Sequence, residues 1–341
     1  MTMQTTAPAE GPKVREYLIG LAGGCVLTLA ALAGGFGILA WSDRLAAPPI
    51  TKIEHLDEKL RFLRNHREID PSLVVVGSSM AWRQFDGAPF AAQLGEGHVL
   101  NGATAFLKVH QTRFLTNFYM DHFPRIKTIM LMLGPPDFQD CTKIPAELFD
   151  TDDASGYVFE QDSPATFYMR YFSAAHYLRR ARDYEAREVP MIGDLFMDGY
   201  GSGPVQRPAA MKKGLRYGRL VFDGACTDAL MKLLPEITAR GIRPVVVFSP
   251  VNPEFRRRYP GTMRRLQAVI ARVRKEADPT IEILDTSESD FRSPEYFDAV
   301  HLQWAAVQRY SRQLARLVLP EASSAAVPPG QPTAAPRGSQ P

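Results

Sequence analysis

The stretch SLVVVGSSMAWRQFD, Ser72 to Asp86, decides the fold class that we predict for this chain. A short apolar run rich in valine leads into one glycine and two serines, and a segment with helical character follows directly. Runs of this kind, bounded by a glycine, are typical of strands buried on both faces. The Gly-Ser-Ser turn has two interpretations: it is an ordinary turn, or it holds one serine at the end of the strand as a nucleophile.

Five segments have the length and branched content of buried strands: SLVVVG (72–77), HVLNGA (98–103), TIMLMLG (128–134), RPVVVFSP (243–250) and TIEILDTS (280–287). Helical stretches lie between and after them, at 107–122, 225–240, 259–276 and 302–318. Strands that alternate with helices in this way predict an α/β fold with a mostly parallel sheet of about five strands and right-handed crossovers.

The chain divides into five parts. Residues 70–320 form the predicted globular domain, and an insert at about 137–224 is too long for a simple crossover. The insert contains the aromatic-rich Ala165–Ala186, so we expect a helical lid or binding platform there, with structural padding as the alternative. Residues 321–341 are rich in Pro, Ala and Ser, and we expect them to be disordered.

The N-terminal part contains a candidate membrane anchor. Tyr17–Trp41 carries no charge and is long enough to cross a bilayer, with aromatic rings at both ends. Ala31–Ala33 resembles a signal-peptidase site, but the apolar run continues past it, which favours an uncleaved transmembrane helix. We therefore expect residues 1–16 to be cytoplasmic, 17–41 to contact membrane lipid, and 42–69 to be a linker with a short amphipathic helix.

Composition excludes some function classes. The net charge of +3 is small, and no recognition motif points to a nucleic-acid partner. The basic run Glu254–Arg265 is either a solvated helix face or a site for an acidic ligand. The histidines show no metal-ligand spacing, so we expect no metal and no cofactor. Cys141 and Cys226 border the insert and form either a disulfide or two buried thiols.

Polar residues follow the predicted strands, where ligands bind in open α/β sheets. They lie at 77–79, 101–103, 134–137 and 249–252. Asp298 and His301 precede the last helix and are three residues apart, so both side chains lie on one side of a turn. A carboxylate that holds one ring nitrogen leaves the other as a general base, which a serine nucleophile requires. If His301 meets Ser79, all three groups of a Ser-His-Asp arrangement are present.

These segments resemble the four sequence blocks of the SGNH (GDSL-type) hydrolase superfamily over roughly residues 70–318, the insert excepted. Residues 77–79 match the first block, Gly102 the second, residues 134–137 the third, and Asp298 with His301 the last. The resemblance implies a flavodoxin-like three-layer sandwich. It also assigns roles: Ser79 is the nucleophile, and Asp298 and His301 are the last-block pair. The residues that it implies for the oxyanion and the substrate are Asn101, Gly102, Asp137 and Asn252.

One position departs from the family pattern. Pro136 stands where the third-block asparagine of the family helps to hold the oxyanion, and proline has no donor. Such a donor is worth about 3 kcal/mol of transition-state stabilisation. Either Asn101, Gln139 or Asn252 substitutes for it, or activity is weak or lost.

A single N-terminal anchor joined to such a domain resembles the membrane-tethered proteins of bacterial exopolysaccharide and cell-wall O-acylation. The resemblance implies a serine O-acyl(acetyl)transferase or esterase on the inner membrane, with the globular domain in the periplasm. It further implies a polysaccharide acceptor and a polytopic membrane O-acyltransferase as partner. Two alternatives stay open: a membrane lipid esterase with the same triad, and a catalytically silent subunit of a polysaccharide synthesis complex.

Overall fold

The structure of the chain is a computed structural model that describes residues 12–42, 44–51, 53–177, 195–207, 215 and 217–319, with side chains in the first helix from Val14 onward. The predicted tail at 321–341 lies outside the described residues, as do most of the predicted cytoplasmic segment and two stretches of the insert, 178–194 and 208–214.

A five-stranded, all-parallel sheet forms the centre of the domain, which confirms the predicted α/β class. Its order is β2-β1-β3-β4-β5, with β1 at Leu73–Gly77, β2 at Val99–Asn101, β3 at Thr128–Leu133, β4 at Arg243–Phe248 and β5 at Glu282–Asp285. β2 and β5 are shorter than predicted because side chains turn the backbone at their ends. Asn101 Oδ1 accepts the N–H of Ala103, and Asp285 Oδ1 accepts the N–H of Ser287.

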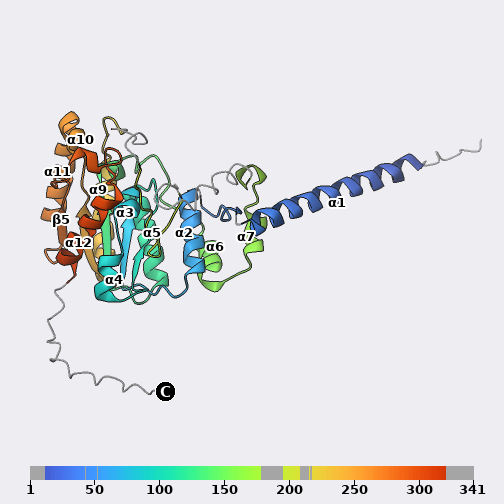
Figure 1. Cartoon of the computed structure of the whole chain (residues 1–341), viewed down its shortest axis with the longest axis horizontal. Coiled ribbons are helices and arrows are strands. Elements are labelled where there is room, and N and C mark those ends of the chain that lie inside the picture. The colour runs from blue at the N-terminus through green and yellow to red at the C-terminus, as the bar shows by residue number, and fades with distance from the viewer. Residues whose placement is uncertain are drawn as a thin grey trace, which may run out of the picture.

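Helices cover both faces of this sheet, so the domain has three layers (Figure 1). Val74 and Val76 point into a core shared with α2 (Glu54–Asn65), α5 (Val109–His122), α9 (Gly224–Ala239) and α11 (Pro260–Glu276). Leu73 and Val75 point into the opposite core with α3 (Ser79–Arg83), α4 (Ala88–Leu94) and α12 (Trp304–Val318). Alternate strand residues thus bury both faces, as the apolar runs predict.

Short helices complete the described part of the domain: η1 at Pro135–Phe138, α6 at Thr151–Ser155, η2 at Gly156–Glu160, α7 at Pro164–Arg170, α10 at Pro253–Arg258 and η4 at Ser293–Glu295. The predicted helix at 259–276 is therefore preceded by a separate one-and-a-half-turn helix. Pro260, which cannot donate a backbone hydrogen bond, occupies the first turn of α11 and separates the two.

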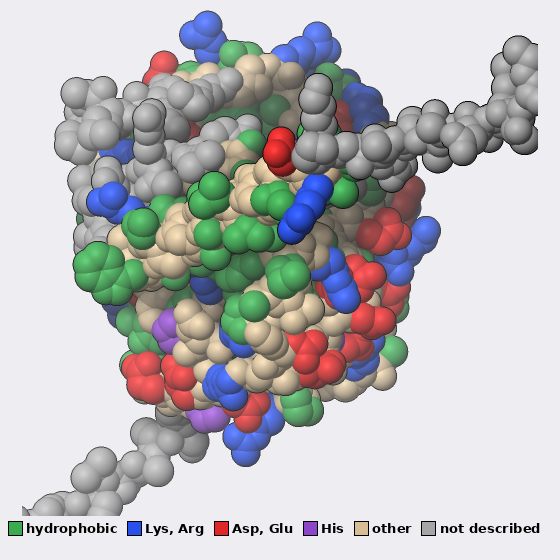
Figure 2. All heavy atoms as spheres, turned by 90° about the vertical axis from the view of Figure 1, so that its right-hand side faces the viewer, with side chains coloured by type: hydrophobic (Ala, Val, Ile, Leu, Met, Phe, Trp, Pro, Cys, Tyr) green, Lys and Arg blue, Asp and Glu red, His purple; other side chains and the backbone are tan. Residues whose placement is uncertain are grey.

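The N-terminal helix α1 (Pro12–Trp41) projects from the domain, and Val14–Trp41 is long and apolar enough to cross a membrane (Figure 1). Its apolar side chains, among them Leu18, Leu27 and Trp41, are exposed along its length, and the helix points toward the viewer in Figure 2. Near its C-terminal end, Phe36 packs against the rings of Tyr168 and Tyr177, with centroids 6.0 and 5.0 Å away. The insert thus contacts the end of α1.

Helix α2 connects this N-terminal region to the domain through buried charged groups. Glu58 Oε1 accepts the N–H of Ala47 at 2.9 Å, and Asp57 Oδ1 accepts the N–H of Thr51 at 2.7 Å. Lys59 is fully buried and donates to the carbonyl oxygens of Asn101 and Gly201, which belong to β2 and the insert. Burial lowers the pKa of Lys59 to about 7, against the attraction of Asp198. One buried amino group therefore joins three parts of the chain.

Cys141 and Cys226 form a disulfide, with their Cα atoms 5.3 Å apart. The sequence left open a disulfide or two buried thiols, and the structure contains the disulfide. It ties the segment after η1 to the first turn of α9, and Cys25 is free and exposed on α1.

Breaking this bridge is expected to destabilise the domain. It closes a loop with a sequence separation of 85, which on the chain-entropy model is worth about 4.5 kcal/mol. The double variant Cys141→Ser/Cys226→Ser should lose roughly 3–5 kcal/mol of unfolding free energy in denaturant titration. The exposed Cys25→Ser variant is the control and should unfold as the wild type does. Maleimide labelling of two thiols in the non-reduced, denatured Cys25→Ser protein would disprove the bridge.

Candidate active site

The turn after β1 has room only for glycine. Gly77 has φ of +154°, and a Cβ atom there would lie 2.3 Å from the carbonyl oxygen of Met132 in β3. Ser78 follows as the N-cap of α3, where its hydroxyl accepts the N–H of Met80 at 3.2 Å. Ser79 is the first residue of α3 and so lies at the carboxyl edge of the sheet. The local sequence itself holds this serine outside the strand.

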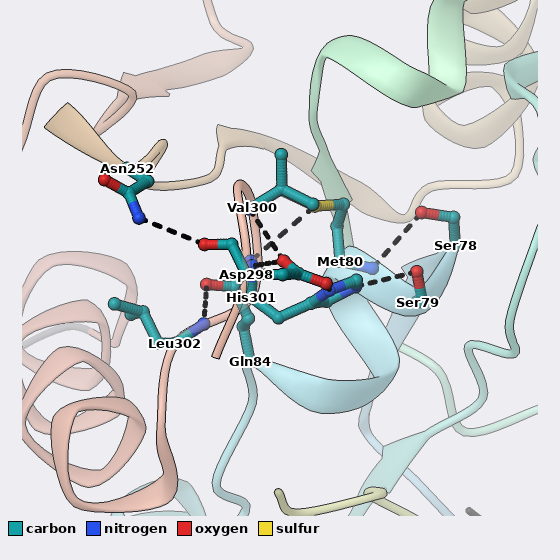
Figure 3. Close-up of polar contacts among 9 residues, drawn as sticks. All are labelled: Ser78, Ser79, Met80, Gln84, Asn252, Asp298, Val300, His301 and Leu302. Carbon is teal, nitrogen blue, oxygen red and sulfur yellow. Dashed lines mark hydrogen bonds and ion pairs between the residues drawn. The ribbon is translucent and has the colours of Figure 1, made fainter. Parts of the chain in front are cut away.

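Asp298 and His301 lie in the loop between η4 and α12. Asp298 Oδ1 accepts the N–H groups of Val300 and His301, each at 2.9 Å, and Oδ2 lies 2.8 Å from His301 Nδ1. These contacts outweigh the effect of burial, so the pKa of Asp298 is lowered. His301 Nε2 lies 2.9 Å from Ser79 Oγ (Figure 3). The structure therefore brings together the three side chains that the sequence selected.

This arrangement can activate a serine. With the Nδ1–H of His301 donating to Asp298, Nε2 is left as the acceptor for the Ser79 proton. Asp298 and His301 are both 5% exposed, so little water competes with these hydrogen bonds. A serine within hydrogen-bond reach of an oriented base is the general geometry of a nucleophile for acyl transfer.

Two amide side chains hold the histidine loop in place. Asn252 follows β4, and its Nδ2 donates to the carbonyl oxygen of Asp298 at 3.1 Å while its Oδ1 accepts the N–H of Glu254. On the other side, Gln84 Oε1 accepts the N–H of Leu302 at 3.3 Å (Figure 3). Asn252 was singled out by its position after a strand. Gln84 was missed, because nothing in its local pattern distinguishes it from an ordinary helix-end residue.

The second block lies beside α3, with its hydrogen-bonding groups already engaged. Asn101 Nδ2 donates to the carbonyl oxygens of Ala81 and Trp82 and to Ser202 Oγ. The N–H of Gly102 donates to the carbonyl oxygen of Val75 at 2.9 Å. Through these contacts Asn101 and Gly102 stabilise the fold. The prediction that they also bind an oxyanion is not tested by them.

At the third block, Asp137 lies within electrostatic reach of the triad. It is 1% exposed, and its Oδ2 accepts the N–H of Gly134 at 2.8 Å. Burial raises the pKa of Asp137 to about 6, although Ser78, the Gly134 N–H, Lys108 and His301 all act in the opposite direction. Stability that the protonated carboxyl contributes is therefore complete below pH ~4 and is lost as the pH rises through ~6.

Lys108 is a second residue that the sequence did not single out. Its Nζ donates to the carbonyl oxygen of Pro136 at 2.7 Å, so a cation lies beside η1. Lys108 directly precedes α5, and nothing in the sequence around it indicates a contact with Pro136. In addition, the N–H of Ser79 makes no hydrogen bond to any described residue, which leaves it able to bind an oxyanion.

The insert returns to the triad at two places. The ring of Tyr217 lies 6.4 Å from that of His301, and the N–H of Arg207 donates to Gln303 Oε1 at 3.0 Å. Through these contacts the insert flanks the histidine loop. A function of the insert as a lid or binding platform stays a prediction, as does the alternative of structural padding.

Among the described residues, no group of three His, Cys, Asp or Glu side chains is placed to hold a metal ion. No protein-family model matches this chain, and no curated protein matches it at a significant level. The geometry of the site is therefore the basis for its chemistry.

Proposed function

We propose that this protein is a membrane-anchored SGNH-type serine O-acyl(acetyl)transferase or esterase that acts on a cell-surface polysaccharide outside the cytoplasmic membrane. The observation that carries the proposal is the chain of two short hydrogen bonds: 2.9 Å from Ser79 Oγ to His301 Nε2, and 2.8 Å from His301 Nδ1 to Asp298.

The proposed reaction has two halves. Ser79 Oγ attacks the acyl carbonyl carbon while its proton passes to His301 Nε2, and the leaving group then departs with that proton, which leaves an acyl-Ser79 ester. In the second half His301 accepts a proton from a sugar hydroxyl or from water, whose oxygen attacks the ester. Ser79 leaves as the hydroxyl and takes the proton back. Asp298 keeps the imidazole oriented throughout.

Two features of the structure support the location that we propose. Helix α1 is long and apolar enough to hold the domain at a membrane. The Cys141–Cys226 bridge supports a domain outside the cytoplasm, because disulfides persist in oxidising compartments. We propose a single-pass protein of a bacterial inner membrane with its domain in the periplasm, supplied with acyl groups by a polytopic membrane O-acyltransferase and using no cofactor.

The topology can be tested with reporter fusions. Alkaline phosphatase joined after Leu319 should be active, because the enzyme requires an oxidising compartment, whereas the same reporter joined after Arg15 should be inactive. N-terminal sequencing of the mature protein should find the original N-terminus. Cleavage near Ala33 would show that the apolar run is a signal peptide, and the anchor would have to be abandoned.

The triad predicts a definite pattern of activity. With p-nitrophenyl acetate as substrate, Ser79→Ala and His301→Ala should each lose roughly 10³-fold or more, and a double variant little beyond that, because triad members act as a unit. Asp298→Asn should keep more activity than either. Ser163→Ala, at an exposed serine whose side chain makes no cap hydrogen bond, is the control. Wild-type turnover by Ser79→Ala would rule out the serine mechanism.

A catalytically silent subunit is the second candidate, and two observations favour it. Pro136 supplies no donor, and the N–H of Gly102 is engaged with Val75. An oxyanion site that lacks these donors stabilises a tetrahedral intermediate poorly.

Restoring the family's asparagine separates the two candidates. Pro136→Asn should raise esterase turnover by up to about 10²-fold if the missing donor limits the reaction. Pro136→Ala, which removes the ring but adds no donor, is the matched control and should show no gain. A silent subunit is favoured if Pro136→Asn gains nothing and Ser79→Ala also supports normal polysaccharide modification in cells.

A further inference from the structure

Two adjoining cavities at the start of α11 are lined by arginine. The first, of about 530 Å³, has Arg219, Arg258, Arg264 and Arg265 among its lining residues, and we call it the arginine cavity. A neighbouring cavity of about 730 Å³ shares Arg264 with it and adds Arg256 and Arg257. All but Arg219 belong to the basic run Glu254–Arg265. From the sequence alone this run is either a solvated helix face or a site for an acidic ligand.

Among the described residues, no carboxylate neutralises the charge of these six arginines. Within the described residues, none of them has a carboxylate within 4.0 Å, although Arg272, further along α11, pairs with Asp228 and Glu276 at 2.8 and 3.0 Å. Glu288 is the sole acidic side chain among the described residues that line either cavity. Like charges held close together repel one another, so this cluster favours an anion as its partner.

Buried donors that line the two cavities add to this preference. Thr262 lines the arginine cavity and is 3% exposed, yet its hydroxyl has no hydrogen-bond partner among the described residues. Arg256 Nε is likewise buried without a partner. Pro260–Thr262 form the first turn of the 17-residue helix α11, where the helix dipole attracts negative charge. Guanidinium, hydroxyl and helix N-terminus together suit carboxylate or phosphate groups.

Two segments of chain connect the surroundings of the triad to the arginine cavity. Tyr217 packs against the ring of His301, and Arg219 lines the cavity only two residues later. From the other side, Asn252 binds the carbonyl oxygen of Asp298 and is the N-cap of α10, whose last residue is Arg258. The arginine cavity is thus joined to the triad through both segments, and a chain-like ligand is the kind that can occupy the cavity and extend toward Ser79.

The position in the fold argues against the anchoring bilayer as the source of the anion. α10 and α11 lie at the end of the domain opposite to α1 (Figure 1). Lipid head groups of a membrane crossed by α1 would face the other end. An anionic polymer outside the membrane can reach either end of the domain.

We propose that the arginine cavity is the subsite for an anionic acceptor polysaccharide, one whose repeating unit carries carboxylate or phosphate groups. The inference rests on the proposed function and names its substrate class. Binding there would position a sugar hydroxyl to attack acyl-Ser79: the hydroxyl oxygen bonds to the acyl carbon, its proton passes to His301 Nε2, and Ser79 Oγ leaves with that proton.

The test measures binding without turnover, on the full-length Ser79→Ala protein in detergent micelles. Fluorescein-labelled oligogalacturonate supplies carboxylates, labelled polyphosphate supplies phosphates, and labelled dextran is the neutral probe. Fluorescence anisotropy should show binding of at least one anionic probe and none of dextran, and the stronger of the two identifies the anion. Adding Arg258→Gln, Arg264→Gln and Arg265→Gln should weaken that binding by about 10-fold or more.

A matched control removes the same charge elsewhere. Arg274→Gln, Lys275→Gln and Arg316→Gln lie on exposed positions outside both cavities, and binding should stay within about two-fold of the parent. The single variant Arg264→Gln replaces the triple one if circular dichroism shows that the latter is unfolded.

Equal weakening in the cavity and control variants would overturn the proposal, as would the failure of both anionic probes to bind. Stronger binding to phosphatidylglycerol vesicles than to either polymer, lost with the cavity arginines, would assign the site to a membrane surface instead. The binding test uses the Ser79→Ala protein and so does not depend on turnover. If it fails, the proposed function is still tested independently by the p-nitrophenyl acetate assay.

Discussion

The close approach of β1 and β3 at Gly77 is the constraint on which the candidate site depends. A methyl group at this position would lie 2.3 Å from the Met132 carbonyl oxygen and 2.9 Å from Ala81 Cβ, so the backbone can turn sharply out of the sheet only without a side chain. That turn makes Ser78 the cap of α3 and Ser79 its first residue. The orientation of the serine is thus a consequence of strand packing.

The rest of the site is assembled around that turn by the order of the strands. β1 lies second in the sheet and β4 fourth, yet Asn252 after β4 fastens the loop that carries Asp298 and His301. Since parallel strands all end at one edge, a loop held at the end of β4 can reach a serine at the end of β1. The two partners are separated by 222 positions in the sequence, and no local signal joins them.

The N-terminal region and the insert are built into the same structure. Lys59 donates to both Asn101 and Gly201, so the helix that follows α1, the end of β2 and the insert share one buried amino group. Breaking one partner of a buried charge leaves the others uncompensated, which couples these parts energetically. The insert also contacts Phe36 of α1 and His301. On our proposal, this arrangement gives a domain held at the membrane at one end and open to polymer at the other.

Local patterns were sufficient for the strands, the α/β class, the apolar N-terminal helix and the choice of Ser79, Asp298 and His301, because each depends on residues within a few positions of one another. Tertiary structure decided what depends on long-range contacts. It paired Cys141 with Cys226, engaged the Gly102 N–H with Val75, and placed Lys108 against Pro136. It also collected arginines from 219 and from 256–265 around shared cavities. Such groups interact only after the sheet has formed, since hydrogen bonds and charges act over a few ångströms and carry no signature along the chain.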